Sequence, residues 1–278
     1  MTMPDQAAAL REARRDPMRF PLPEGGGDTP AVVVGSGKGG VGKSIAAVSF
    51  AASLAEAGHR VLLVDGDQNL GNLHVLLGVR PTLTPEALLH ESLAPADIVV
   101  PVAERLFLMP ADSGTDAVQR LGPTDRARLQ RRVSGIYADY DAVIVDSAAG
   151  LDSALRCVAL HATRLVVMTM PEATALTDAY ALIKVVHGQL PRLPVDVVVN
   201  RLHEPREGEV AFDKLRAAAV RFLGRPIDYL GGVPEDREMR ALAADPARLL
   251  TPSTGTPAQR AFAGLASRLM SRRVATAS

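Results

Sequence analysis

The sequence predicts an α/β fold, in which a mostly parallel β-sheet carries helices on both of its faces. Short apolar runs alternate along the chain with longer stretches patterned in Ala and Leu, and this alternation is typical of βαβ units. A glycine-rich loop joins the first apolar run to the first helical stretch, which is a common strand-to-helix connection in such folds. With 278 residues, of which 47% are hydrophobic, the chain can bury the core of one large domain.

The predicted elements follow in order from the N-terminus. Residues 1–20 carry Pro and Asp near both ends and predict a short helix, whereas residues 21–30 combine Pro with Gly and predict a flexible linker. The domain itself is expected over residues 31–273, with a C-terminal amphipathic helix from about residue 257. Within these limits the apolar runs predict strands at 31–35, 60–65, 105–110, 141–146, 164–170, 195–200 and 225–233.

The composition excludes several classes of protein. The chain has 31 basic and 31 acidic residues, so no strong overall field favours a nucleic acid or an acidic substrate. The single cysteine, Cys157, cannot form an internal disulfide or a paired-cysteine metal site, and it is expected to pack in a helix. No apolar run approaches the roughly 20 residues of a membrane span, and no apolar signal segment begins the sequence. A cytoplasmic protein is therefore expected.

The loop at residues 37–44, GKGGVGKS, satisfies the pattern G-x-x-x-x-G-K-[ST] between a predicted strand and a helix that is expected to end at Gly58. Its glycines let backbone N–H groups converge on phosphate oxygens, and the helix N-terminus adds partial positive charge. Lys43 is predicted to reach the β- and γ-phosphates, and the Ser44 hydroxyl to bind Mg²⁺. The predicted nucleotide-binding residues of this loop are Gly37, Lys38, Gly39, Gly40, Val41, Gly42, Lys43 and Ser44.

Acidic residues follow two of the predicted strands. Asp146 ends the run at 141–146, at the edge of a parallel sheet where ligands bind, and it is predicted to hold Mg²⁺ through water. Asp65 and Asp67 follow the second strand, so both are expected to face the phosphates, and a carboxylate near the γ-phosphate can orient an attacking water. A solvated acidic turn is the alternative for this pair.

Lys38 is not explained by the general phosphate-loop pattern. Only four of the 31 basic residues are lysines, and two of the four, Lys38 and Lys43, lie in this one loop. A lysine at position 38 of an arginine-rich chain indicates a site that needs a slim, flexible point charge. Such a side chain could reach across an interface. The alternative is a lysine that faces solvent.

KGGVGKS, at 38–44, resembles the deviant Walker A motif of the MinD/ParA class of dimerising ATPases. The resemblance implies a nucleotide cycle in which ATP and Mg²⁺ bridge a homodimer and slow, dimer-dependent hydrolysis to ADP releases it. It implies that Lys38 contacts the nucleotide of the partner subunit and that Asp67 positions the attacking water. It also assigns DSAAG, which ends at Gly150, to the second switch, Asn200 to the adenine, and Pro234 to a loop over the base.

Three further segments narrow this resemblance to the FlhG/FleN (also called YlxH) family of flagellar-number regulators. DSAAGL at 146–151 and PEATALTDAYALIK at 171–184 resemble that family, and the resemblance covers nearly the whole chain. DQAAALR at 5–11 is similar to the DQAxxLR motif with which the family stimulates the signal-recognition-type GTPase FlhF. The alternative for this segment is a frayed helical tail. The resemblance assigns FlhF contacts to Asp5, Gln6, Leu10 and Arg11. Further implied partners are flagellar C-ring proteins or a flagellar transcription activator.

The sequence departs from the family pattern around its first switch. The family pattern is close to D-x-D-x-G-L-x-N-x-D, whereas Asn69 replaces the Gly here, His74 replaces the last Asp, and Ile45 stands where Thr or Asn is common. Because Asp67 is kept, hydrolysis is expected, although a catalytically weak scaffold or anti-activator is an alternative function. A ParA-type ATPase that segregates DNA is a second alternative. The zero net charge and the N-terminal motif argue against it, so no specific nucleic acid is expected.

The C-terminal helix has two interpretations. Phe262, Leu265 and Leu269 lie at positions i, i+3 and i+7, which is the spacing of a last helix packed on the core. The same apolar stripe, among arginines, is typical of a helix that lies on an anionic membrane. The family resemblance implies such a membrane-targeting helix and a peripheral location on the inner face of the cell membrane. One such helix anchors weakly, so dimerisation would be required for avidity.

Overall fold

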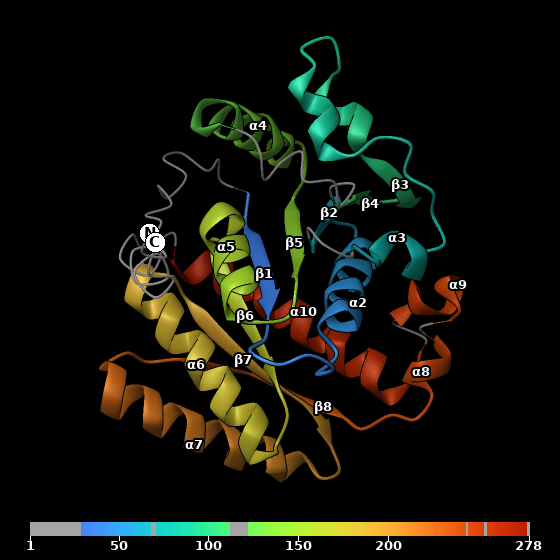
Figure 1. Cartoon of the computed structure of the whole chain (residues 1–278). Coiled ribbons are helices and arrows are strands. Elements are labelled where there is room, and N and C mark those ends of the chain that lie inside the picture. The colour runs from blue at the N-terminus through green and yellow to red at the C-terminus, as the bar shows by residue number, and fades with distance from the viewer. Residues whose placement is uncertain (1–28, 68–70, 112–121, 243, 253–254, 277–278) are drawn as a thin grey trace, which may run out of the picture.

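The computed structural model describes residues 29–67, 71–111, 122–242, 244–252 and 255–276. The predicted N-terminal helix and nearly all of the predicted linker lie outside these residues. The described part forms one sheet with helices packed on both faces, so the predicted fold class is confirmed (Figure 1). Its strands are β1 (Ala31–Gly35), β2 (Val61–Gly66), β3 (Val100–Ala103), β4 (Leu106–Met109), β5 (Ala142–Ser147), β6 (Arg164–Thr169), β7 (Val195–Leu202) and β8 (Asp228–Pro234).

The strand order across the sheet is β3-β4-β2-β5-β1-β6-β7-β8, which places β1 between β5 and β6. All neighbouring pairs are parallel except β3 and β4. Each predicted apolar run overlaps one of these strands. The sequence missed β3, because its short stretch VPVA contains a proline and alternates between half-buried and exposed residues, which is the pattern of an edge strand.

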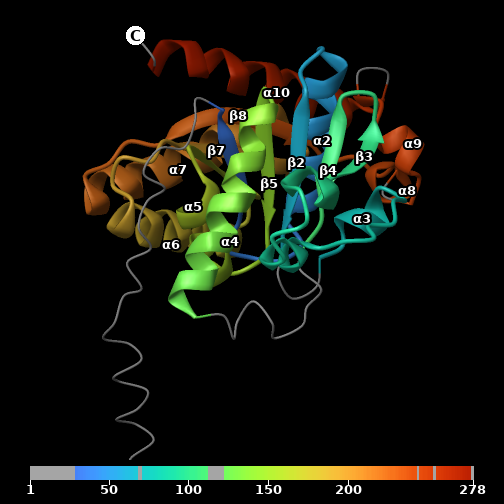
Figure 2. The ribbon, with the colours of Figure 1, turned by 90° about the horizontal axis from the view of Figure 1, so that it is seen from above.

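The helices form a layer on each side of the sheet (Figure 2). They are α2 (Lys43–Glu56), α3 (Leu73–Leu76), α4 (Pro123–Ile136), α5 (Leu151–His161), α6 (Ala173–Gln189), α7 (Pro205–Leu223), α8 (Met239–Leu242), α9 (Pro246–Leu249) and α10 (Pro257–Thr276). Helices α4 to α7 cover one face, and α2 and α10 cover the other. Within the described ranges, three 3₁₀ segments lie at Pro85–Leu89, Pro95–Ile98 and Tyr137–Asp139.

Alternate residues of the central strand point into different cores. Val32 and Val34 pack with α2 and α10, whereas Ala31 and Val33 pack with the helices of the opposite face. Because both faces of β1 are covered, all five of its residues are buried. Burial on both faces explains why β1 appears in the sequence as a continuous apolar run and not as an alternating one.

The C-terminal helix α10 is part of the core. Phe262, Leu265 and Leu269 are 1%, 0% and 3% exposed, and the Phe262 ring packs edge-on against Phe50 of α2 with centroids 5.6 Å apart. The prediction that these three side chains contact a membrane is therefore wrong, because they already fill the space between α10 and the sheet. Among the described residues, no helix is long and apolar enough to cross a membrane.

An ion triad around the buried Asp196 fastens α10 to the sheet. Asp196 of β7 is completely buried, and its Oδ2 accepts a hydrogen bond from Arg164 Nη1 of β6 at 2.6 Å. Its Oδ1 accepts a hydrogen bond from Arg272 of α10, which also donates to the Tyr229 carbonyl oxygen at 3.0 Å. Because both carboxylate oxygens are paired, the triad is satisfied as long as all three residues remain.

We expect Asp196→Ala to lower the free energy of unfolding by about 3–5 kcal/mol, because it leaves two guanidinium groups without their partner. Urea denaturation of the nucleotide-free protein measures this loss. The matched control is Asp213→Ala on the surface of α7, which breaks a 3.0 Å pair with Arg216 and should cost less than about 1 kcal/mol. Equal losses in the two variants would show that the triad does not fasten α10.

Candidate functional site

The carboxyl ends of β1, β2 and β5 meet at one edge of the sheet. Val34 pairs with Asp146, and Asp65 pairs with the same Asp146 from the other side. The glycine-rich loop leaves β1 at this edge and leads directly into α2. The structure therefore brings the loop and the predicted acidic residues together, as expected for a parallel sheet.

Glycines in the loop meet two different requirements. Gly40 and Gly42 have φ values of 78° and 92°, in the left-handed region that side chains disfavour. Gly37 is required for another reason, since a Cβ at that position would lie 2.2 Å from the carbonyl oxygen of Asp178 on α6. The first glycine of the motif thus allows the loop to pack against a helix that begins more than a hundred residues later.

The two lysines of the loop differ in exposure. Lys43 is 8% exposed at the first position of α2, whereas Lys38 is exposed at the outer part of the loop. Gly42 precedes α2 and has no side chain that could cap the first N–H groups of the helix. These N–H groups and the Lys43 ammonium form a positive site for a phosphate at the start of α2.

Asp146 is the strongly perturbed acid of the site. It is 5% exposed, and burial raises its pKa to about 7, although a hydrogen bond from Ser44 and the charge of Lys43 act in the opposite direction. Its Oδ1 atom is buried without a hydrogen-bond partner among the described residues. An orphaned carboxylate oxygen beside a hydroxyl group fits a hard cation such as Mg²⁺, so Ser44 and Asp146 would hold it. Bound Mg²⁺ supplies positive charge that neutralises phosphate oxygens.

Asp65 holds the loop that follows β2 through two hydrogen bonds. Its Oδ1 accepts a hydrogen bond from the Asp67 N–H at 3.2 Å, and its Oδ2 accepts one from the Leu73 N–H at 3.0 Å. Desolvation by burial raises its pKa overall. The Asp65 carboxylate thus closes the loop that carries Asp67, and its orientation towards the phosphates stays a prediction. Asp67 itself is half-buried, and Asn69 lies outside the described residues.

Asn200 lies against the phosphate loop. It is 9% exposed, its Nδ2 donates to the Val41 carbonyl oxygen at 2.9 Å, and its Oδ1 accepts from the Arg201 N–H at 2.9 Å. The sequence missed this contact with the loop, although a polar residue inside an apolar strand signals a need for partners. Pro234 ends β8 and pairs with Leu202, two residues beyond Asn200. Contact of Asn200 and Pro234 with a base stays a prediction.

The second switch lies beside the loop as well. Ala149 Cβ would be 4.0 Å from a Cβ placed on Gly39, so the segment after Asp146 approaches the outer part of the loop. Gly150 has a φ of 101° and precedes the first residue of α5. The predicted partner-contacting residues Asp5, Gln6, Leu10 and Arg11 lie outside the described residues.

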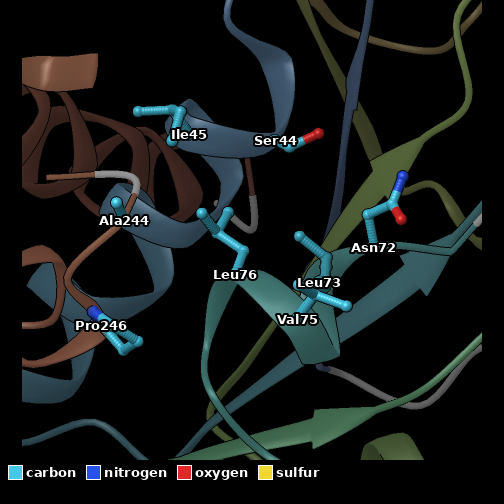
Figure 3. Close-up of a pocket in the computed structure, with 8 residues that line it drawn as sticks. All are labelled: Ser44, Ile45, Asn72, Leu73, Val75, Leu76, Ala244 and Pro246. Carbon is cyan, nitrogen blue, oxygen red and sulfur yellow. The ribbon is translucent and has the colours of Figure 1, made fainter. Parts of the chain in front are cut away.

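An open, mostly apolar groove of about 540 Å³ borders the site (Figure 3). It lies between the start of α2, helix α3 and the start of α9 with the residue Ala244 before it. Figure 3 shows the Ser44 hydroxyl and the Ile45 side chain on opposite sides of the start of α2, with Ile45 beside the groove. His74 is half-buried on α3, next to Val75, which is 67% exposed. The groove is lined by Ser44, Ile45, Asn72, Leu73, Val75, Leu76, Ala244 and Pro246.

In the nucleotide-free and metal-free protein, we expect Asp146→Asn to raise the free energy of unfolding at pH 8 by about 2–4 kcal/mol. The folded pKa of about 7 lies above the ordinary 3.8, so the folded state binds the extra proton and stability falls as the pH rises through this window. Asparagine lacks the charge and does not show this fall. Urea denaturation between pH 4 and pH 8 measures the difference, which should shrink towards pH 4.

The control is Asp152→Asn, which changes an exposed residue of α5. It should alter the free energy of unfolding little at pH 4 or at pH 8. If the free energies of unfolding of Asp146→Asn and the wild-type protein differed by the same amount at every pH, burial of the Asp146 charge would not be the cause of the difference.

Solved structures with the same fold include cell-division ATPases. The MinD structure from Pyrococcus furiosus superposes with a TM-score of 0.72, over 87% of this chain and 98% of that one, at 23% sequence identity. The MinD protein from Pyrococcus horikoshii, solved in complex with Mg-ADP, gives a TM-score of 0.69 over 87% and 96%, at 24% identity. At these identities the likeness shows a shared fold.

Sequence comparison identifies the family. Residues 32–246 match the model of the CobQ/CobB/MinD/ParA nucleotide binding domain. The antiactivator FleN of Pseudomonas aeruginosa is 34% identical over 209 residues, which cover 75% of each protein. The flagellum site-determining protein YlxH of Helicobacter pylori is 29% identical over 211 residues, covering 74% of this chain and 70% of that protein. The chain therefore belongs to the MinD/ParA class of P-loop ATPases, in the family that includes FleN and YlxH.

Proposed function

We propose that this protein is an ATP-controlled switch that is a monomer with ADP and a homodimer with ATP and Mg²⁺. The observation that carries the proposal is the different placement of the two loop lysines, with Lys43 buried at the start of α2 and Lys38 exposed. A buried lysine serves the nucleotide of its own subunit, whereas an exposed one can reach a nucleotide in a second copy. The nucleotide would then be the element that joins the two copies.

The other residues of the site would complete the cycle. Ser44 and Asp146 would hold Mg²⁺, and Asp67 would orient the water that attacks the γ-phosphate. Asp65 supports this role because its hydrogen bond to the Asp67 N–H fixes the start of the loop. Loss of the γ-phosphate would remove the contact on which the dimer depends. Hydrolysis that requires both copies would be slow in the monomer.

The output of the switch would be the number and placement of flagella. The names of two relatives, an antiactivator and a flagellum site-determining protein, support this output. We further propose that the N-terminal DQAAALR segment stimulates an FlhF-type GTPase, and that flagellar C-ring proteins or a transcription activator bind the folded domain. Such partners would meet the protein in the cytoplasm.

We expect the wild-type protein to elute as a dimer with MgATP and as a monomer with MgADP in size-exclusion chromatography with light scattering. Lys38→Ala should stay monomeric with MgATP while it still binds nucleotide, because Lys43 remains. The control is Lys184→Ala, which removes an exposed lysine of α6 and should leave the dimer intact. Normal dimerisation of Lys38→Ala would refute the cross-subunit role.

Single-turnover hydrolysis separates a working ATPase from a nucleotide-binding scaffold. The departures at Ile45, Asn69 and His74 make this comparison necessary. The same MgATP reaction is measured for the wild-type protein and for Asp67→Ala. A rate at least about ten-fold lower in the variant supports general-base or water-positioning chemistry. Equal rates would favour the scaffold.

Deletion of residues 1–20 should leave MgADP binding unchanged and abolish stimulation of FlhF GTP hydrolysis. The physical reason is that the nucleotide site is built from residues 35 onwards, whereas the predicted FlhF motif precedes the linker. GTP turnover by FlhF is measured with the full chain, with the truncated chain, and with Arg11→Ala as a minimal change. FlhF turnover that is the same with the full and the truncated chain would contradict the assignment.

A further inference from the structure

Arg201 has an unusual backbone conformation next to the phosphate loop. It lies in β7, directly after Asn200, with a φ of 58°. A side chain disfavours this left-handed region, and the other positive φ values among the described residues belong to glycines. Such strain persists where surrounding contacts hold the residue, and it often accompanies function.

The side chain of Arg201 reaches back to the loop. Its Nη2 donates a hydrogen bond to the Gly40 carbonyl oxygen at 3.0 Å, and Asn200 Nδ2 donates to the next carbonyl, that of Val41, at 2.9 Å. The two residues are also tied to each other by the hydrogen bond from the Arg201 N–H to Asn200 Oδ1 at 2.9 Å. Two adjacent residues of β7 thus hold two consecutive carbonyl groups of the phosphate loop.

These hydrogen bonds determine where the N–H groups of the loop point. In a trans peptide, the carbonyl group and the N–H of the next residue point in opposite directions. With the Gly40 and Val41 carbonyl groups turned towards β7, the N–H groups of Val41 and Gly42 point to the opposite side. The Ser36 hydroxyl holds the Lys38 carbonyl oxygen in the same way at 2.6 Å. N–H groups that converge on one side of a loop are the usual phosphate ligands.

We propose that Arg201 is a positioning residue for nucleotide binding, which orients the phosphate loop by holding the Gly40 carbonyl group. Arginine suits this place because its planar fork donates to Gly40 through Nη2 while its Nε lies 3.9 Å from Glu235 Oε2. Glu235 follows Pro234 and donates its own N–H to the Leu202 carbonyl oxygen at 2.8 Å. Arg201 therefore joins the phosphate loop to the segment that is predicted to close over the base.

This inference deepens the proposed function and rests on it, since the ligand is a nucleoside di- or triphosphate. The first test is the affinity of the full chain for MgADP, measured by calorimetry, together with the melting temperature of each variant. Arg201→Gly removes the guanidinium and also the backbone strain, so we expect about ten-fold weaker MgADP binding with a melting temperature no lower than that of the wild-type protein. Arg201→Lys keeps the charge without the fork, and we expect an intermediate affinity.

Arg206→Ala is the matched control, because it removes the same charge from an exposed position in the first turn of α7. We expect this variant to bind MgADP as the wild-type protein does. If Arg201→Gly bound MgADP as tightly as the wild-type protein, or if Arg206→Ala lost the same affinity, the inference about Arg201 would be overturned and the proposed function would stand. A melting temperature that falls together with the affinity would also overturn it, because it would indicate a merely structural role. If the wild-type protein bound no MgADP, the proposed function would fail and the inference with it.

Amide hydrogen exchange of the nucleotide-free protein provides a second readout. If Arg201 orients the loop before the ligand arrives, the N–H groups of residues 39–43 should exchange several-fold faster in Arg201→Gly than in the wild-type protein or in Arg206→Ala. Strands β1 and β5 should exchange as before, which separates a local change from a general loss of stability. Identical exchange of the loop in all three proteins would show that Arg201 does not preorganise it.

Discussion

The parallel pairing of β1 with β5 is the interaction on which the site depends. It places the strand that enters the phosphate loop beside the strand that carries Asp146 near its carboxyl end, while β2 brings Asp65 to the other side of Asp146. Because helices cover both faces of these strands, the acids are removed from water, and burial raises the pKa of each. Asp65 is accommodated by two backbone N–H groups, whereas one oxygen of Asp146 has no partner among the described residues. The packing of the sheet thus leaves a buried carboxylate oxygen of Asp146 without a partner, and a bound cation would offset the free-energy cost of burying it.

The site retains features that a fold selected for stability alone would lack. A buried carboxylate without a full set of partners and a non-glycine residue with a φ of 58° both lie at the same edge of the sheet. By contrast, the buried acid away from the site, Asp196, has both oxygens paired with arginines. Ligands that bind only the folded state stabilise it, so Mg²⁺ and nucleotide would stabilise this protein beyond their direct contacts. The free energy of unfolding would therefore depend on whether Mg²⁺ is bound beside Asp146.

The parts of this structure that could be predicted from sequence depend on neighbours in the chain. The phosphate loop, every strand except β3 and the acid near the end of β5 are local patterns, and each lies at or close to its predicted place. Contacts between distant segments could not be predicted in this way. Gly37 packs against Asp178, and the loop carbonyl groups are held by Asn200 and Arg201, which are separated from them by about 160 positions. The role of α10 was ambiguous for the same reason, since one apolar stripe suits either a core or a membrane until its neighbours are known.

The cations around the phosphate loop have separate tasks. Lys43 is buried at the start of α2, beside Asp146, and the Arg201 guanidinium lies against the Gly40 carbonyl group of the loop. Both are placed to act within one subunit, since Lys43 is buried and Arg201 is hydrogen-bonded to the loop. Lys38 has its carbonyl group fixed by Ser36, yet its side chain is exposed and forms no ion pair within the described part of the chain. In the proposed dimer, a fixed backbone with an exposed ammonium group would favour contact with a nucleotide in the second copy, because the position of the charge is set before that copy arrives.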